Sequence, residues 1–214
     1  MNPVDGSPRP SAARERLLAT ASALFYDEGI HAVGVDRLVA AASVTRATFY
    51  RHYPSKDDLV VAYLQARDHV LRAGVAHVES TGAQPAEVLA AIAAGIGDDI
   101  CGPSFRGCPF INAAAEYPDP THPARVAVRD HRRWFQDLVE RLLGAAQHPH
   151  PSAAAREYVL LRDGAMIGGY LEDALDVRAE FTAAVRRVCD PHARQAGATR
   201  SGGTSRADGR DAAT

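Results

Sequence analysis

The sequence predicts an all-α fold, and three observations support this prediction. Alanine, leucine, arginine and glutamate supply much of the composition, so the summed propensity favours helix along most of the chain. No segment alternates apolar and polar residues as a half-buried strand would. Proline and glycine gather in short breaks between segments with helical periodicity. We therefore expect helices joined by short loops.

Length and composition are those of an ordinary globular protein. The chain has 214 residues, of which 46% are hydrophobic and 23% are charged. A chain of this size buries a core without needing a metal or a disulfide. Its net charge of −2 gives no general attraction to nucleic acid or to a membrane surface. An anionic partner must therefore be met by a local group of cations.

The apolar segments and the cysteines indicate the compartment. The longest apolar run, Val88 to Gly97, is far shorter than the roughly 20 residues that cross a bilayer, and the N-terminal segment has no apolar signal-peptide region. Cys101, Cys108 and Cys189 are irregularly spaced and odd in number, which favours reduced thiols over disulfides. We predict a cytoplasmic protein without membrane contact.

The N-terminal part of the chain is predicted to form two short helices between two longer ones. We expect helices at about 11–28, 35–42, 45–52 and 55–79. Gly29 ends the first helix, and Ser43 lies in the turn between the short ones. Ser55 can cap the long helix, with Asp58 at the acidic position of a weaker capping box. This arrangement is a helix-turn-helix pattern.

The remainder of the chain is also predicted to be helical. Proline and glycine breaks divide it into helices at about 85–100, 110–117, 123–146, 153–173 and 177–189. Residues 1–10 and 191–214 have too few apolar side chains to order themselves, and we expect tails there. The predicted domains are residues 11–56, joined through a connecting helix at 55–79, and residues 57–190.

The second short helix differs chemically from the other helices. Its outward positions carry cations and hydroxyl groups, whereas Val44, Phe49 and Tyr53 are spaced to pack inward. No acidic residue occurs anywhere from Ser43 to Lys56. The outward residues are Arg46, Thr48, Tyr50, Arg51 and His52.

Such a helix has the width and the donors needed to enter the major groove of DNA. Its arginines are able to contact guanine bidentately, and Thr48 can contact the methyl group of thymine. Tyr50, His52 and Lys56 are placed to donate to phosphate oxygens. An ordinary solvated helix face is the alternative for any three charges alone. The spacing of the two helices and the absence of acids favour DNA.

The segment from Leu17 to Leu64 closely resembles the N-terminal DNA-binding domain of TetR-family transcriptional regulators. The most specific parts are Ala-Leu-Phe in the first helix with its following glycine, and Thr-Phe-Tyr-Arg-His-Tyr-Pro-Ser-Lys at 48–56. The resemblance implies an all-helical homodimer, in which the first three helices bind DNA and the others bind a ligand and form the dimer. It implies a repressor that a small-molecule inducer releases from a palindromic DNA operator.

The resemblance also implies which residues meet DNA, and three positions depart from the family pattern. Gly34 stands where a Ser or Thr N-cap is usual. Ser43 replaces a turn glycine, which requires a strained conformation or a slightly opened turn. Ala47 replaces Gly or Pro, so the docking angle and base preference are open. The expected DNA-binding residues are Arg37, Thr45, Arg46, Ala47, Thr48, Tyr50, Arg51, His52 and Lys56.

The last two helices are candidates for a dimer interface. Gly164, Gly168 and Gly169 lie inside a predicted helix, where each costs about 1 kcal/mol relative to alanine. Close approach of another helix would offset that cost. Following the resemblance, we expect helices 153–173 and 177–189 to form the four-helix bundle of a homodimer. Packing within one chain is the alternative.

A ligand pocket is expected among the middle helices, because the segment from Phe105 to Glu116 resembles a recurrent stretch of one TetR subgroup. Cys108 lies near a helix start and follows Arg106, so a thiol-based redox-sensing regulator is an alternative function. A small buried residue is the simpler interpretation of this cysteine. The ligand candidates, which combine apolar walls with polar groups, are Phe105, Cys108, Phe110, Asn112, Glu116, Tyr117, Trp134 and Tyr170.

Other functional classes have little support in the sequence. It contains no Gly-rich phosphate loop, GxSxG, HExxH or paired-cysteine motif, so we predict neither an enzyme nor a cofactor. The histidines and aspartate of loops 119–122 and 148–150 lack metal-ligand spacing, and we predict no metal. A helical interaction module that has lost DNA binding is a further alternative, supported only by Ser43 and Ala47.

Overall fold

The computed structural model describes residues 11–190, and within them the chain forms nine α-helices and no strand. The all-α prediction is confirmed, and the largest discrepancy is in the last helix, which begins at Ala174 rather than Val177. The predicted tails lie outside the described residues. The helices are α1 (Ala12–Glu28), α2 (Val35–Ala41), α3 (Arg46–His52), α4 (Lys56–Ser80), α5 (Pro85–Ile100), α6 (Pro109–Glu116), α7 (Pro123–Ala145), α8 (Pro151–Leu171) and α9 (Ala174–Cys189).

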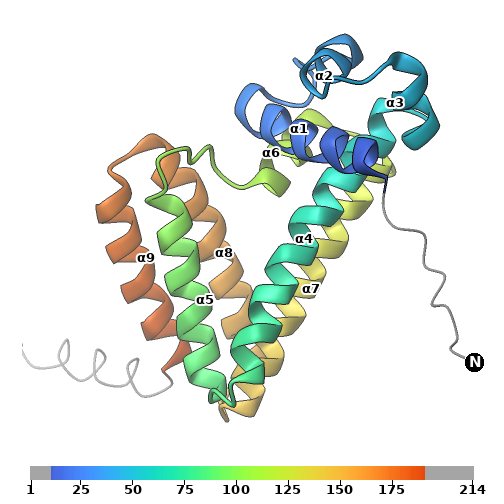
Figure 1. Ribbon diagram of the computed structural model, residues 1–214. Helices are drawn as coiled ribbons and strands as arrows, with labels where there is room; N and C mark the ends of the chain where they lie inside the picture. The colour runs from blue at the N-terminus through green and yellow to red at the C-terminus, as the bar shows by residue number, and fades with distance from the viewer. Residues whose placement is uncertain (1–10, 191–214) are drawn as a thin grey trace, which may run out of the picture.

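The helices form two parts that share α4 (Figure 1). Helices α1 to α3 lie together at one end of the molecule, above the first turns of α4. Helices α4 and α7 run side by side, while α5, α8 and α9 pack on one another opposite them. The short helix α6 lies directly below α1, between the two parts. Among residues 11–190, no helix has the length and apolar character needed to span a membrane.

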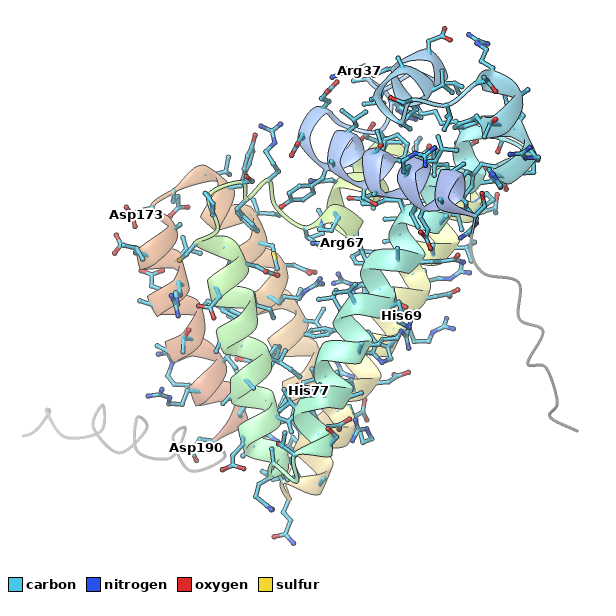
Figure 2. All side chains as sticks on the ribbon, viewed as in Figure 1. Arg37, Arg67, His69, His77, Asp173 and Asp190 are labelled. Atoms are coloured by element: carbon cyan, nitrogen blue, oxygen red, sulfur yellow. The ribbon has the colours of Figure 1, made fainter. Side chains whose placement is uncertain are left out.

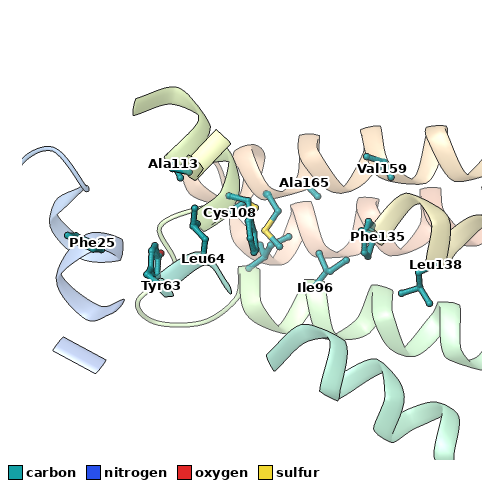
Figure 3. Packing of buried hydrophobic residues seen from close by; sticks show 14 of the residues in the cluster. Phe25, Tyr63, Leu64, Ile96, Cys108, Ala113, Phe135, Leu138, Val159 and Ala165 are labelled. Atoms are coloured by element: carbon teal, nitrogen blue, oxygen red, sulfur yellow. The ribbon is translucent and has the colours of Figure 1, made fainter. Parts of the chain in front are cut away.

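A single apolar core extends through both parts. Phe25 of α1 meets Tyr63 of α4 edge to face, with ring centroids 5.8 Å apart. From there the buried side chains continue through Leu64 to Phe135 of α7, as Figure 3 shows. The N-terminal helices are therefore packed onto the long connecting helix rather than tethered by a flexible linker.

Local sequence signals explain where α2, α3 and α4 begin. Ser55 and Asp58 form the predicted capping box at α4, with both reciprocal hydrogen bonds present. Gly34 precedes α2 without a side-chain cap, as its lack of a side chain requires. In the turn between α2 and α3, Ser43 adopts φ 52°, the left-handed conformation that favours glycine. Ser43 therefore accepts a strained conformation in place of the turn glycine.

The glycines of α8 have different surroundings. A Cβ at Gly169 would lie 2.3 Å from Cγ2 of Ile100 on α5, and one at Gly168 would lie 3.5 Å from Val177 on α9. A Cβ at Gly164 would meet nothing within 4 Å. Packing within one chain thus accounts for Gly169, whereas no contact among the described residues requires a glycine at position 164 or 168.

Gly169→Ala should lower stability, because the buried side chain of Ile100 would have to shift to admit the new methyl group. We expect a loss of about 1–3 kcal/mol. Gly144→Ala on α7 is the control, since a Cβ there meets nothing within 4 Å and alanine favours helix by up to about 1 kcal/mol. Urea unfolding of the two variants measures both effects. Equal stability of the two variants would contradict the close α5–α8 contact.

Candidate nucleic-acid interface and effector cavity

Helix α3 is anchored by two aromatic side chains. Phe49 is fully buried and Tyr53 is 3% exposed, so both hold α3 against the N-terminal core. Thr45 is the N-cap of α3, and its hydroxyl oxygen accepts from the backbone amide of Thr48 at 3.1 Å. The predicted inward positions are thus confirmed for Phe49 and Tyr53, and the polar positions are left outside.

The predicted DNA-binding side chains lie on the outer surface of the N-terminal part. Arg37 projects from its outer edge, away from the C-terminal helices (Figure 2). Thr48, His52 and Lys56 are partly buried. Burial lowers the pKa of Lys56, which the neighbouring carboxylates of Glu116 and Asp57 offset only in part. The exposed members are Arg37, Thr45, Arg46, Ala47, Tyr50 and Arg51.

Two of these arginines are paired with carboxylates of neighbouring helices. Arg46 Nε donates to Asp36 Oδ1 at 2.9 Å, and Arg37 Nη2 donates to Glu28 Oε1 at 2.9 Å. Arg51 has no ion pair among the described residues. Sequence reasoning missed both pairs, because it counted acids only within the segment from 43 to 56 and these carboxylates come from α1 and α2.

A cavity of about 270 Å³ lies among α4, α5, α6, α7 and α8. Its walls are mainly apolar and aromatic, and include Phe110, Trp134 and Phe135. Its charged or polar groups come from separate helices: Arg67 from α4, Asp99 from α5, Cys108 beside α6, His131 from α7 and Arg162 from α8. Figure 2 shows Arg67 on α4, close to α6. A mostly apolar cavity with a few converging polar groups is the usual form of a small-molecule site.

His131 is a deeply buried group of this cavity, at 2% exposure. Its Nδ1 lies 2.7 Å from Asp68 Oδ1, and its ring stacks on Phe110 at 3.6 Å. Partial burial raises the pKa of Asp68, but hydrogen bonds from Arg72 and His131 outweigh this and keep it below its usual value. Burial lowers the pKa of His131 to about 4, although Asp68 opposes the change.

Helix α6 connects the cavity with the N-terminal helices. At its start, Cys108 and Phe110 line the cavity. At its end, the carboxylate of Glu116 accepts from the backbone amides of Ile30 and His31, at 2.8 and 2.5 Å, in the loop between α1 and α2. The next residue, Tyr117, donates to Asp57 at the beginning of α4 at 3.0 Å. One short helix therefore contacts both parts of the molecule.

Comparison with known proteins decides the family. Residues 17–63 match the family model described as bacterial regulatory proteins of the tetR family. The crystal structure of SCO4454, a TetR-family transcriptional regulator from Streptomyces coelicolor, superposes with a TM-score of 0.80 at 48% sequence identity, and the match covers 83% of this chain and 94% of that one. The chain belongs to the TetR family.

Two further regulators are similar to parts of this chain. The transcriptional activator FasR of Mycolicibacterium smegmatis is 40% identical over 62 residues, which are 29% of this chain and only 28% of FasR. The regulator LmrA of Bacillus subtilis is 23% identical over 133 residues, covering 61% of this chain and 71% of LmrA. The protein is thus a TetR-family transcriptional regulator with a DNA-binding helix-turn-helix, and this family consists of regulators rather than enzymes.

The eight predicted ligand residues are divided between different places. Cys108, Phe110 and Trp134 line the cavity. Asn112, Glu116 and Tyr170, again with Cys108, line a second cleft of about 370 Å³ between α1, α6 and α8. Tyr117 and Phe105 line neither of these. The sequence analysis did not predict four charged or polar residues of the cavity, because they come from four separate helices and no local motif connects them. They are Arg67, Asp99, His131 and Arg162.

Cys108 is the N-cap of α6 and is 2% exposed. The cation beside it is Arg162 of α8, whose Nη2 donates to its Sγ at 3.4 Å. The neighbouring cation expected from the sequence, Arg106, instead lies over the ring of Tyr170. Because the thiol is buried, it lacks the solvent access that is typical of redox-sensing cysteines.

In residues 11–190, no group of three or more His, Cys, Asp or Glu side chains is arranged to hold a metal ion.

Acid should destabilise the protein through His131. Its pKa falls from 6.5 to about 4 on folding, so the unfolded chain binds more protons within this pH range. Stability therefore decreases as pH falls from 6.5 to 4, by at most about 3 kcal/mol. Unfolding free energies at several pH values should show His131→Asn losing this slope, while His77→Asn on α4 keeps it. An unchanged slope in His131→Asn would show that the buried imidazole is not its source.

Proposed function

We propose that the protein is a homodimeric, ligand-responsive repressor, which occupies a palindromic DNA operator and leaves it when a small-molecule inducer fills the cavity. Two α3 helices of a dimer reach successive major grooves when their centres lie roughly 34–36 Å apart. An inducer that binds more tightly to a different spacing shifts the dimer away from DNA. This shift cannot exceed the difference in its affinity for the two states.

The contact pattern of α6 is the observation that carries this proposal. A ligand that displaces Phe110 or Cys108 moves the start of α6. The two amide hydrogen bonds to Glu116 transmit that movement to the loop before α2. Hydrogen bonds to a charged carboxylate are stronger than those between neutral groups, so this end of α6 is a firm attachment to the DNA-binding helices.

At the DNA interface, we assign two kinds of role to the outward residues. Arg46, Thr48 and Arg51 are proposed to contact base edges, and Arg46 must exchange Asp36 for DNA. The remaining residues hold the phosphate backbone or position α3. They are Arg37, Thr45, Ala47, Tyr50, His52 and Lys56.

The proposed dimer interface is the outer face of α8 and α9. Eight large apolar side chains are exposed among the described residues, and five of them lie on these two helices. Leu160 and Leu171 are the clearest cases, at 67% and 71% exposure. Leu160 and Gly164 line a shallow groove between α8 and α9. A second copy of this face would cover these side chains in a four-helix bundle.

Removing a phosphate contact should weaken DNA binding uniformly. For Lys56→Ala, we expect lower affinity and a plot of log affinity against log salt concentration that is flatter by about one unit. Arg133→Ala on α7 removes the same charge elsewhere and should keep the wild-type slope. Fluorescence anisotropy with DNA from upstream of the protein's own gene measures this. A protein without salt-dependent binding would fit the interaction-module alternative.

A charge placed on the dimer face should separate the protomers. Leu160→Glu brings a carboxylate into the proposed interface, where Glu157 and Glu180 already line the groove. We expect sedimentation velocity to show a monomer with much weaker operator binding. Ala76→Glu, on an exposed position of α4, should remain dimeric. Persistence of the dimer in Leu160→Glu would refute this interface.

A further inference from the structure

The polar groups of the cavity define the kind of molecule that fits it. This inference rests on the proposed function, since it takes the cavity among α4 to α8 as the effector site. Besides the five helix-borne groups already described, the lining consists of aliphatic and aromatic side chains and small residues. The cavity can therefore discriminate between ligands only through contacts with these polar groups. Two of them have unused hydrogen-bonding capacity.

The first is His131, whose protonation state follows from its neighbours. Asp68 is an ionised carboxylate held by Arg72 at 2.6 Å, so it can only accept a hydrogen bond from His131 Nδ1. The imidazole is neutral at pH 7, because burial disfavours its charged form. Nδ1 therefore carries the proton, and Nε2 presents a lone pair. This atom is buried and has no hydrogen-bond partner among the described residues.

The second is Arg162, a guanidinium at 5% exposure without a carboxylate of its own. Its Nη1 lies 3.3 Å from Asp163, but that carboxylate is also bound by Arg132 at 2.6 Å. Its Nη2 donates only to the thiol of Cys108, which is a weak acceptor. A buried charge is costly unless it is paired. An anionic oxygen in the cavity would supply a partner that Arg162 does not share.

The remaining charges of the lining do not remove this preference. Arg67 and Asp99 contribute one positive and one negative charge, and Arg67 opposes the rise in the pKa of Asp99 that burial causes. Arg162 is thus the buried cation of the cavity, and it shares its one carboxylate partner with Arg132. It is also close enough to His131 to be among the charges that lower the pKa of the imidazole.

Shape adds a third restriction. Phe110, Trp134 and Phe135 supply flat aromatic surfaces to the cavity, and aromatic rings favour stacked or edge-to-face neighbours. A cavity of about 150 Å³ holds a benzene molecule. The volume of about 270 Å³ found here therefore suits one ring or two fused rings with polar substituents.

We propose that the effector is a flat aromatic hydroxy acid of one or two rings, whose hydroxyl group donates to His131 Nε2 and whose carboxylate accepts from Arg162. The hydroxyl must not lie beside the carboxylate on the ring, because an internal hydrogen bond would then occupy it. Suitable probes are 3-hydroxybenzoate, 4-hydroxybenzoate and 6-hydroxy-2-naphthoate.

Calorimetric titration of the full-length protein with matched probe pairs tests the hydroxyl contact. The methoxy counterpart of each probe keeps the ring and the carboxylate but has no hydrogen to donate. At least one hydroxy acid should bind about ten-fold or more tightly than its methoxy counterpart, since the latter leaves Nε2 unsatisfied. His131→Asn, whose amide can still donate to Asp68, should abolish this difference. The comparison in the wild-type protein stands even if the variant fails to fold.

The carboxylate contact is tested on α8. Arg162→Met should remove the preference for 6-hydroxy-2-naphthoate over 2-naphthol, whereas Arg156→Met, an exposed position on the same helix, should retain it. Binding of methoxy acids or uncharged naphthalenes as tightly as the hydroxy acids would overturn the proposal. Failure of every probe to bind would also overturn it, while leaving operator binding and its salt dependence unaffected.

Operator release distinguishes the ligand class from the regulatory function. A bound hydroxy acid should lower operator affinity about ten-fold or more in the wild-type protein. Glu116→Gln, which weakens the attachment of α6, should bind the probe equally well but respond less. A hydroxy acid that binds with the expected selectivity and leaves operator affinity unchanged would support the ligand class and refute the induction mechanism.

Discussion

Burial of one face of the first turns of α4 holds the N-terminal helices against the C-terminal bundle. Leu59, Val60 and Leu64 are fully buried, and Tyr63 is 2% exposed. These side chains belong to the same apolar core as the N-terminal helices and the C-terminal bundle. Because no flexible segment separates the two, the direction of α3 relative to the bundle is determined by packing. A signal from the bundle therefore has to repack side chains, as cores of protein density deform little.

Electrostatics on the N-terminal surface are more balanced than the sequence of α3 suggests. Asp36 and Glu28 neutralise Arg46 and Arg37 in the free protein. Exposed pairs of this kind contribute little to stability, so the proposed exchange of these carboxylates for DNA has a small cost. In the proposed complex, the positive surface of α3 is thus partly generated on binding, which agrees with a chain whose net charge is −2.

The interior of the bundle contains polar groups that a purely structural core would avoid. His131 lowers acid stability, and Arg162 is a buried charge with a shared counterion. Apolar residues of similar volume usually serve stability as well or better. Both residues line the cavity at the end of α6 remote from Glu116, where the proposed effector would contact them. Under the proposed function, stability and ligand recognition make opposite demands on the same helices.

The helices, the cap of α4 and the character of α3 could be predicted from the sequence, because these depend on neighbouring residues. The capping box at Ser55 and the inward spacing of Phe49 and Tyr53 are local patterns of this kind. Only the tertiary structure brought Asp68 to His131 and Glu116 to the loop at Ile30, since these partners are far apart in the chain. Such contacts depend on the rotation and crossing of whole helices, which periodicity does not specify. For the same reason, Glu116 and Asn112, which were expected in a ligand pocket, lie in the cleft beside α1. The place of Arg162 in the cavity was likewise not predicted from the sequence.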